Sequence, residues 1–493
     1  MNLGDSIRTG VKWLMLGSTG GQILDFAFGI ILARLLVPAD FGMIVTIQIF
    51  TGFAAMLATG GMGQSLIRAK NATDDEFHSV FTLQLALGIL IFAGFFLAAP
   101  WFARYFENPL YTDLLRVSAL SFVLRPFALV RIAWLNRQMD FRKRALVEIA
   151  GSASTGVASA LMAWAGLGVW SLTLSGLVGA AIVGTLYFVA TPLRLRVRFD
   201  AEVLRRHSGF GLKITANDFL DYVRDQSTSL ILSKTIGPSS LGLFNKARSL
   251  ATMPNRIMTP ATGQTVFRAL SKVQDDLDQT KYVFYRTITL LMVYVSPSLI
   301  GLWWVAEPFV RVIYGEKWLS VAEPMQIIVL AGFLRTIWIP CGLVLGAQNR
   351  LTQGLVGEVV SLFVALPAYF IGLRWGLDGV AWALAFCALF NTIYAYVLVY
   401  RTIPTRVVDL VRALAPVLLL DAILFAALAL VHVLLVAFTI LPPPLYLTVM
   451  IVAGVLTYGS AFLFIPIPAL KTEAARWRQK IKQVLMSMSR PFR

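Results

Sequence analysis

The chain has 493 residues, of which 57% are hydrophobic and 14% are charged, and its formal net charge is +17 at pH 7. Soluble domains are roughly 45–50% apolar and about 25% charged, so this composition excludes a water-soluble globule and indicates a protein embedded in a bilayer. No soluble stretch is long enough to fold alone, so the positive charge indicates loops facing an anionic membrane surface and not a partner nucleic acid.

The apolar segments predict an all-α polytopic membrane protein with about 14 transmembrane helices, because a helix needs about 20 apolar residues to cross the hydrocarbon core. In chain order, these segments lie near residues 13–36, 41–67, 79–102, 112–135, 145–166, 168–191, 212–236, 240–266, 282–305, 323–347, 352–373, 377–400, 413–437 and 444–468.

Basic residues are distributed unequally between the two sides of the predicted bundle. The loops VPAD, GLG and LPPP, which follow the first, fifth and thirteenth segments, contain no Lys or Arg, whereas 136–144, 192–207 and the tail from Lys471 are rich in both. Basic loops face the cytoplasm, so we expect both termini there.

The C-terminal tail has an amphipathic pattern. Its apolar face is formed by Ala474, Trp477, Ile481, Val484 and Leu485, with Lys and Arg opposite. This pattern is typical of a helix lying on an anionic membrane, and a solvated tail is the alternative interpretation.

An internal repeat divides the chain. A shift of 200 residues places 29–44 over 229–244, and a shift of 210 aligns later residues. The aligned pairs are Asp25/Asp225, Arg34/Lys234, Pro38/Pro238, Gly42/Gly242, Arg125/Arg335 and Glu148/Glu358. Because each copy has an even number of helices, both copies enter the membrane in the same direction. We expect two lobes related by an axis along the membrane normal, around a central cleft.

The repeat predicts the domain organisation of the chain. The expected parts are an N-lobe of six helices (1–191), a cytoplasmic interfacial linker (192–211), a C-lobe of six helices (212–400), two further helices (401–468) and a basic amphipathic cytoplasmic tail (469–493).

The segments ILARLLVPADFG (31–42), ILSKTIGPSSLGLFNKARSLATMPNRI (231–257) and FRALSKVQDD (267–276) resemble the polysaccharide-exporter branch of the multidrug/oligosaccharidyl-lipid/polysaccharide (MOP) flippase superfamily. The likeness is to colanic-acid, succinoglycan and teichuronic-acid exporters. It implies a two-lobed inverted V, like that of the MATE multidrug transporters. It also implies a non-enzymatic flippase that moves undecaprenyl-diphosphate-linked oligosaccharide repeat units across the bacterial inner membrane by alternating access. The product would be an exopolysaccharide, a capsule or the O-antigen of lipopolysaccharide, and the partners would be membrane lipids, a polysaccharide polymerase and export machinery.

Charges inside predicted spans cost roughly 2.5–3.5 kcal/mol each at the membrane centre and therefore mark a function or a buried pair. Arg34, Lys234, Arg125 and Arg335 recur in both halves of the chain. A sugar-diphosphate lipid has no matching two-fold symmetry, so we interpret these four residues as members of structural ion pairs within the lobes.

Charges that occur in one repeat only are the candidates for substrate binding: Arg224, Lys246, Arg248 and Arg256, together with Asn245. At 100° per residue, Asn245, Arg248, Thr252, Arg256 and Thr259 form one polar stripe along the segment 240–266. Arginine suits the oxygens of a diphosphate because its planar guanidinium binds them in pairs. The alternative is that these arginines pair with the aspartates of 212–236.

Asp218, Asp221 and Asp225 share one face of the segment 212–236, and Asp25 is the repeat partner of Asp225. These carboxylates could bind H⁺ or Na⁺ to drive a transport cycle, or they could neutralise Arg224 and Arg248. We predict no metal site and no cofactor beyond such an ion, because the Cys and His residues are scattered and no phosphate-binding loop is present.

Three other functions compete with the flippase. A MATE-type cation-coupled drug or metabolite antiporter would favour an acidic, aromatic-lined cleft, whereas the predicted spans contain more basic than acidic residues. A membrane glycosyltransferase or polymerase would need a large external loop, and the longest one (306–322) is short. A structural scaffold would account for neither the repeat nor the charged stripes.

Overall fold

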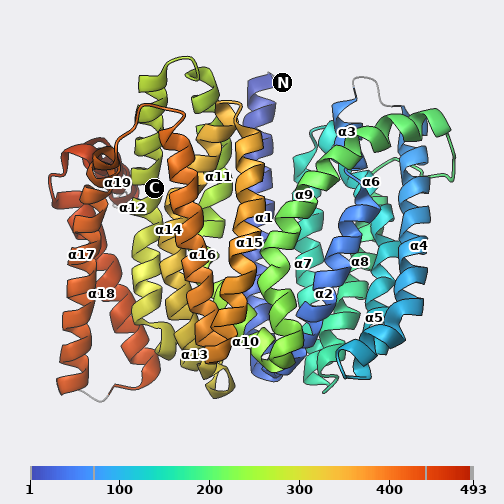
Figure 1. Ribbon diagram of the computed structural model, residues 1–493, viewed down its shortest axis with the longest axis horizontal. Coiled ribbons are helices and arrows are strands. Elements are labelled where there is room, and N and C mark those ends of the chain that lie inside the picture. Colours follow the sequence, from blue (N-terminus) through green and yellow to red (C-terminus); the bar gives the residue numbers. More distant parts are fainter. Residues whose placement is uncertain (1–2, 70–72, 439–440, 489–493) are drawn as a thin grey trace. The chain divides into compact units, whose positions relative to one another are not determined.

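The computed structural model describes residues 3–69, 73–438 and 441–488, and every regular element in those ranges is helical (Figure 1). In chain order the helices are α1 (Leu3–Leu35), α2 (Pro38–Thr59), α3 (Met62–Arg68), α4 (Asp74–Tyr105), α5 (Leu110–Ala119), α6 (Ser121–Arg137), α7 (Phe141–Trp164), α8 (Val169–Ala190), α9 (Ala201–Thr235), α10 (Gly237–Ala251), α11 (Met253–Lys272), α12 (Leu277–Trp304), α13 (Ala306–Ile313), η1 (Glu316–Val321), α14 (Ala322–Ala347), α15 (Leu351–Gly372), η2 (Leu373–Trp375), α16 (Gly376–Tyr400), α17 (Val407–Phe438), α18 (Pro443–Phe464), η3 (Pro468–Leu470) and α19 (Lys471–Met488).

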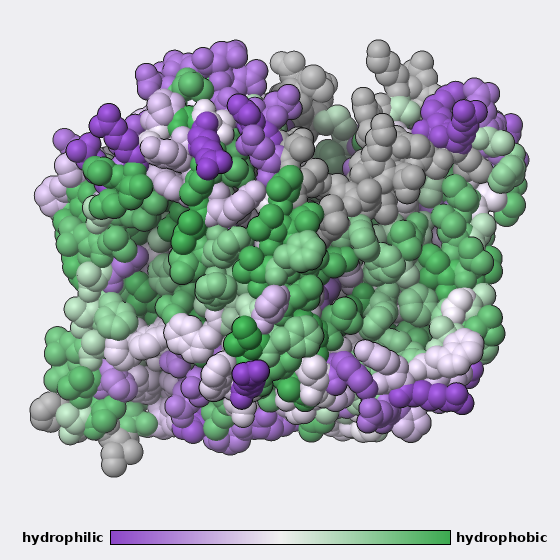
Figure 2. All heavy atoms as spheres, viewed as in Figure 1, coloured by the Kyte–Doolittle hydropathy of each residue, from purple (hydrophilic) through white to green (hydrophobic). Residues whose placement is uncertain are grey.

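Within the described ranges, 11 helical stretches are long and apolar enough to cross a membrane, and one of them, Val356–Tyr400, contains most of α15 and all of α16. The predicted spans 212–236 and 240–266 are helical as α9, α10 and α11, but they are not among these 11 stretches of the described residues. Hydrophobic residues occupy the middle of the helices and hydrophilic residues gather at their ends (Figure 2). The all-helical membrane fold is confirmed, whereas the count of 14 spans is not.

The chain forms two compact units, Met1–Asn245 and Lys246–Arg493. In the first unit, α7 packs between α1 and α8, α4 packs against α5 and α6, and α9 packs against α2, α3 and α4. In the second unit, α14 packs against α11, α12 and α16, while α17 and α18 pack against each other and against α12. The lobe boundaries expected from the repeat stay a prediction.

The backbone turns at equivalent places in the two repeats. Met139, with φ 57°, precedes α7, and Asn349, with φ 56°, precedes α15. A left-handed backbone is uncommon for a residue other than glycine, so its occurrence at two positions separated by the predicted shift of 210 residues supports a structural repeat.

The segment between α8 and α9 packs against other parts of the first unit. Leu193 packs in a core with Met62 and Leu66, and Arg198 donates a hydrogen bond to the carboxylate of Asp75. Asp200 then caps α9 by accepting hydrogen bonds from the backbone N–H groups of residues 202 and 203 at 3.0 and 3.2 Å, which suits its position at a helix start.

The predicted tail helix is present as α19 and is attached to α12. Its Trp477 Nε1 donates to the hydroxyl of Tyr294 at 3.0 Å, and Glu473 pairs with Arg286 at 3.5 Å. Ala474 is buried, while the side chains of Val484 and Leu485 lie outside the described part of the structure. The placement of this helix on a membrane surface stays a prediction.

Candidate substrate-binding site

The polar stripe predicted along 240–266 runs across the junction of α10 and α11. The backbone N–H of Thr252 donates to the carbonyl of Arg248, and that of Arg256 donates to the carbonyl of Thr252, each at 3.1 Å. The i to i−4 hydrogen bonding of an α-helix therefore continues through the junction. Arg248, Thr252 and Arg256 consequently stay on one face, as the periodicity predicted.

Arg256 is exposed on α11, and its guanidinium has no hydrogen-bond or ion-pair partner among the described residues. Arg248 is half-buried. Asn245 donates to the carbonyl of Leu241 one turn earlier, at 3.2 Å. The Thr252 hydroxyl likewise donates to the carbonyl of Arg248, at 2.7 Å. The two arginine side chains thus supply hydrogen-bond donors along about two turns of helix, an arrangement that can bind an anion.

Lys246 differs from the two arginines because its ammonium group lies over aromatic rings. Its Nζ is 4.8 Å from the ring centroid of Tyr314 and 5.5 Å from that of Trp318. Both rings are buried at the turn between α13 and η1. This cation–π contact stabilises the charged Lys246 side chain within the second unit.

A buried asparagine that we did not single out in the sequence holds α11 in place. Asn255 is 3% exposed; its Nδ2 donates to the carbonyl of Gly332 at 3.2 Å, and its Oδ1 accepts from the hydroxyl of Thr336 at 2.9 Å. Because successive helical residues point about 100° apart, anchoring Asn255 to α14 orients the neighbouring Arg256. In the sequence, Asn255 could have been noticed as an amide residue directly before the candidate Arg256.

The acidic candidates of the first unit are only partly described. Asp225 is exposed on α9, and Asp25 is exposed on α1, where its carboxyl is hydrogen-bonded to Ser152 of α7. The side chains of Asp218, Asp221 and Arg224 lie outside the described part of the structure, so ion coupling stays a prediction. The described residues contain no group of three or more His, Cys, Asp or Glu side chains that could hold a metal ion.

The repeated basic residues have different surroundings. Lys234 pairs with Glu107 at 2.9 Å and donates to the carbonyl of Tyr105 at 2.6 Å, so the end of α9 is linked to the loop after α4. The Lys234 ammonium beside Glu107 holds the pKa of this carboxyl below its usual range. The guanidinium carbon (Cζ) of Arg125 lies 5.8 Å from the ring centroid of Phe122. Arg125 has no carboxylate partner among the described residues.

Arg34 and Arg335, the other two predicted members of structural ion pairs, are exposed on α1 and α14. They are the repeat partners of Lys234 and Arg125. Their structural role stays a prediction.

The sequence profile of a family described as "Polysaccharide biosynthesis protein" matches residues 31–323. The Escherichia coli (strain K12) lipopolysaccharide biosynthesis protein WzxC is 25% identical to this chain over 82% of each protein. The Rhizobium meliloti succinoglycan biosynthesis transport protein ExoT is 26% identical over 71% of this chain and 70% of its own. The solved structure of the lipid II flippase MurJ in an inward closed conformation superposes with a TM-score of 0.72 and 14% identity, over 91% of this chain and 98% of that chain.

Proposed function

Because the chain belongs to the polysaccharide biosynthesis protein family, we propose that it is a flippase for undecaprenyl-diphosphate-linked oligosaccharide repeat units. It would move these lipids from the inner to the outer leaflet of the bacterial inner membrane by alternating access. The repeat units would then enter a surface polysaccharide through a polymerase and export machinery. The cargo leaves the protein chemically unchanged, so the protein is not an enzyme in this proposal.

The observation that carries the proposal is the basic stripe of Arg248, Thr252 and Arg256 along α10 and α11. The diphosphate is the part of the cargo that every repeat unit shares, whatever its sugars. Guanidinium groups bind phosphate oxygens in pairs with charge-assisted hydrogen bonds. An anion bound at this stripe would offset part of the cost of holding two arginines in a helix bundle.

The carboxylates of α1 and α9 provide the energy coupling in this proposal. Asp25 and Asp225 would bind H⁺ or Na⁺, since the affinity of a carboxylate for a cation changes when its surroundings change. Fluorescence quenching of a pH indicator trapped in vesicles would detect H⁺ movement, and dependence of transport on Na⁺ would identify Na⁺ instead.

A transport assay in proteoliposomes tests the proposed function. Fluorescent undecaprenyl-diphosphate oligosaccharide would be placed in vesicles with and without the purified protein, and the label exposed on the outer leaflet would be bleached chemically. We expect the protein to raise the bleachable fraction over time. An equal rate in vesicles with and without the protein, in both the presence and the absence of ion gradients, would contradict the flippase.

A further inference from the structure

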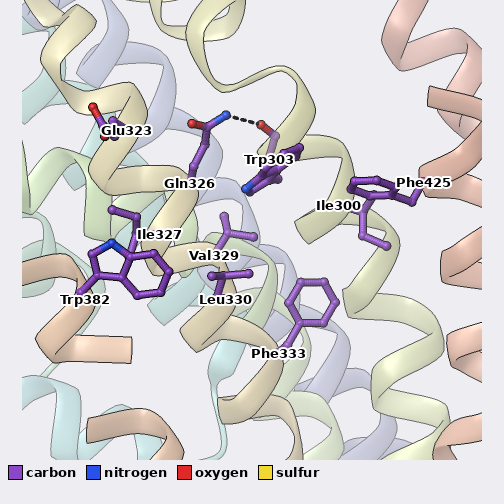
Figure 3. Close-up of a pocket in the computed structure, with 10 residues that line it drawn as sticks. All are labelled: Ile300, Trp303, Glu323, Gln326, Ile327, Val329, Leu330, Phe333, Trp382 and Phe425. Atoms are coloured by element: carbon purple, nitrogen blue, oxygen red, sulfur yellow. Dashed lines mark hydrogen bonds between the residues drawn. The ribbon is translucent and has the colours of Figure 1, made fainter. Parts of the chain in front are cut away.

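The second unit contains a cavity of about 530 Å³ that the proposed flippase does not use. It lies among α12, α14, α16 and α17, and its lining includes no residue of the basic stripe (Figure 3). Its volume is within the roughly 300–1,000 Å³ that is typical of small-molecule sites. The cavity is therefore large enough for a specific organic ligand.

Aromatic rings form much of the cavity wall. Trp382 of α16 lies on one side, and Trp303 of α12 and Phe425 of α17 lie on the other (Figure 3). The rings of Trp303 and Phe425 are 5.8 Å apart between centroids. Trp382 is 56% exposed and Phe425 is 44% exposed, so these rings offer free faces to a ligand. Aromatic faces are electron-rich and attract cations.

The polar side chains of α14 bring hydrogen-bond acceptors to the cavity. Glu323 and Gln326 line it one turn apart, and the described residues that line it include no Lys or Arg. The Nε2 of Gln326 donates to the carbonyl of Trp303 at 2.9 Å, which uses one of its two amide hydrogens and holds the side chain in place, and its Oε1 remains an acceptor. Glu323 also lies close enough to Asp378, at the start of α16, for the two carboxyl groups to interact, so acidic groups gather at this end of the cavity.

A buried carboxyl group lies one helical turn from the cavity wall. Asp421 is 7% exposed and accepts a hydrogen bond from Ser296 at 2.7 Å. Ser296 is one turn from Ile300 on α12, and Asp421 is one turn from Phe425 on α17. Asp421 is therefore a further acidic group near the cavity, although it is not one of the lining residues.

The carboxylate of Glu323 has a second explanation, because it lies in the first turn of α14, where a negative charge is favoured by the helix dipole. That explanation does not account for the exposed aromatic rings or for the acceptor of Gln326, which lie around the same space. A wall that faced only lipid chains would need neither a carboxylate nor an amide.

We propose that this cavity binds a hydrophobic organic cation, that is, one positive charge carried on an apolar body. The charge would lie next to Glu323 and Gln326, and the apolar body would lie among Trp303, Trp382 and Phe425. This cargo is opposite in charge to a diphosphate, so the site is independent of the basic stripe.

Two ions of nearly equal shape and opposite charge test this proposal. Binding of radiolabelled tetraphenylphosphonium and, separately, of tetraphenylborate would be measured by equilibrium dialysis on the purified full chain in an uncharged detergent. The variants are Glu323→Gln, which keeps the shape of the side chain, and Trp382→Leu, which removes an exposed ring. Asp113→Asn, at an exposed carboxylate of the first unit, is the matched control, and thermal melting of each variant verifies folding.

We expect saturable phosphonium binding and borate binding at least about tenfold weaker, a difference of about 1.4 kcal/mol. Glu323→Gln and Trp382→Leu should each weaken phosphonium binding about tenfold, and Asp113→Asn should leave it unchanged. Equal affinities for the two ions would overturn the proposal. Wild-type phosphonium affinity in folded Glu323→Gln would also overturn it, even if Trp382→Leu bound weakly, because the charge preference would then have no source in this cavity.

Discussion

Gly42 and Gly242 pack reciprocally: a Cβ added to Gly42 would collide with the carbonyl oxygen of Pro238, and a Cβ added to Gly242 would collide with that of Pro38. The four residues are the proline and the glycine of the same short motif in the two repeats, at the starts of α2 and α10. The repeated motif therefore makes a backbone contact with its own copy. Glycine allows this approach because it has no side chain.

This contact predicts the effect of alanine at either glycine. Gly42→Ala and Gly242→Ala should each lower the free energy of unfolding by about 1–3 kcal/mol, the usual cost of overpacking, because the colliding atoms belong to the backbone and cannot rotate away. Melting temperatures of detergent-purified variants would measure this. Gly184→Ala is the control, since a Cβ there meets no atom within 4 Å; a similar loss in all three variants would contradict the reciprocal contact.

The Lys234–Glu107 pair should stabilise the fold in a pH-dependent way. The pKa of Glu107 is lowered in the folded chain, which means that folding favours the ionised form of this carboxyl group. The stabilisation is therefore fully present above the unfolded-state pKa of Glu, about 4.3, and is lost as the pH falls through the folded-state value. The effect should be small because the pair is exposed to solvent.

A double-mutant cycle in melting temperature with Glu107→Gln and Lys234→Ala measures this coupling. At pH 7 the two single variants should each melt slightly below the wild type. The double variant should melt no lower than the less stable of the two single variants. At pH 3 the coupling should be much smaller. Coupling of equal size at both pH values would rule out an ion pair.

The basic stripe predicts a loss of substrate binding without a loss of folding. Arg248→Ala and Arg256→Ala should each weaken binding of undecaprenyl diphosphate about tenfold or more, since a hydrogen bond to a charged group contributes about 1.5–3 kcal/mol. Lysine at either position should restore binding only in part, because an ammonium group keeps the charge and loses the paired donors. Export of polymer in cells should fall in parallel.

Arg268 provides the matched control for these variants. It is an exposed arginine on α11, and at 100° per residue it lies on the side of the helix away from the stripe. Arg268→Ala changes the net charge equally and should bind the lipid as the wild type does. Unchanged binding by both alanine variants of the stripe would remove α10 and α11 from the substrate site.

Asn255 should matter for stability because its partners are buried with it. Asn255→Ala leaves the Thr336 hydroxyl with one acceptor fewer and the Gly332 carbonyl without its amide donor, which should destabilise the protein by about 1–3 kcal/mol. Thermal melting measures this loss. Thr336→Val should lose less stability, since the hydrogen bond from the Asn255 amide to the Gly332 carbonyl is kept. An unchanged melting temperature for Asn255→Ala would show that α11 is held by other contacts.

Single cysteines test the orientation predicted from loop charge. A cysteine-free parent protein needs only two substitutions, because Cys341 and Cys387 are free and buried and can be replaced by alanine. Ser239→Cys and Leu441→Cys should react with an impermeant maleimide on intact cells, and Lys143→Cys should react only after the membrane is opened. The reverse pattern would invert the topology.

The sequence by itself determined the membrane class, the positions of most helices, the repeat and the family. Length and hydropathy are local properties, and a bilayer admits only helices that satisfy their own backbone groups over a set length. The shift of 200 residues that aligns Arg34 with Lys234 is visible by comparison of letters alone. The face shared by Arg248 and Arg256 also followed from helical periodicity, which the junction of α10 and α11 preserves.

Tertiary structure alone decided which of these features touch. The role of Asn255 depends on Gly332, which is 77 residues away, and the cation-attracting cavity takes its lining from four helices. The same holds for Gly42, whose neighbour is a carbonyl group of the other repeat. Composition and periodicity state which face of a helix is polar or apolar, but not which other face it meets. That choice depends on the fit of side-chain shapes between helices, which no segment of the chain contains by itself.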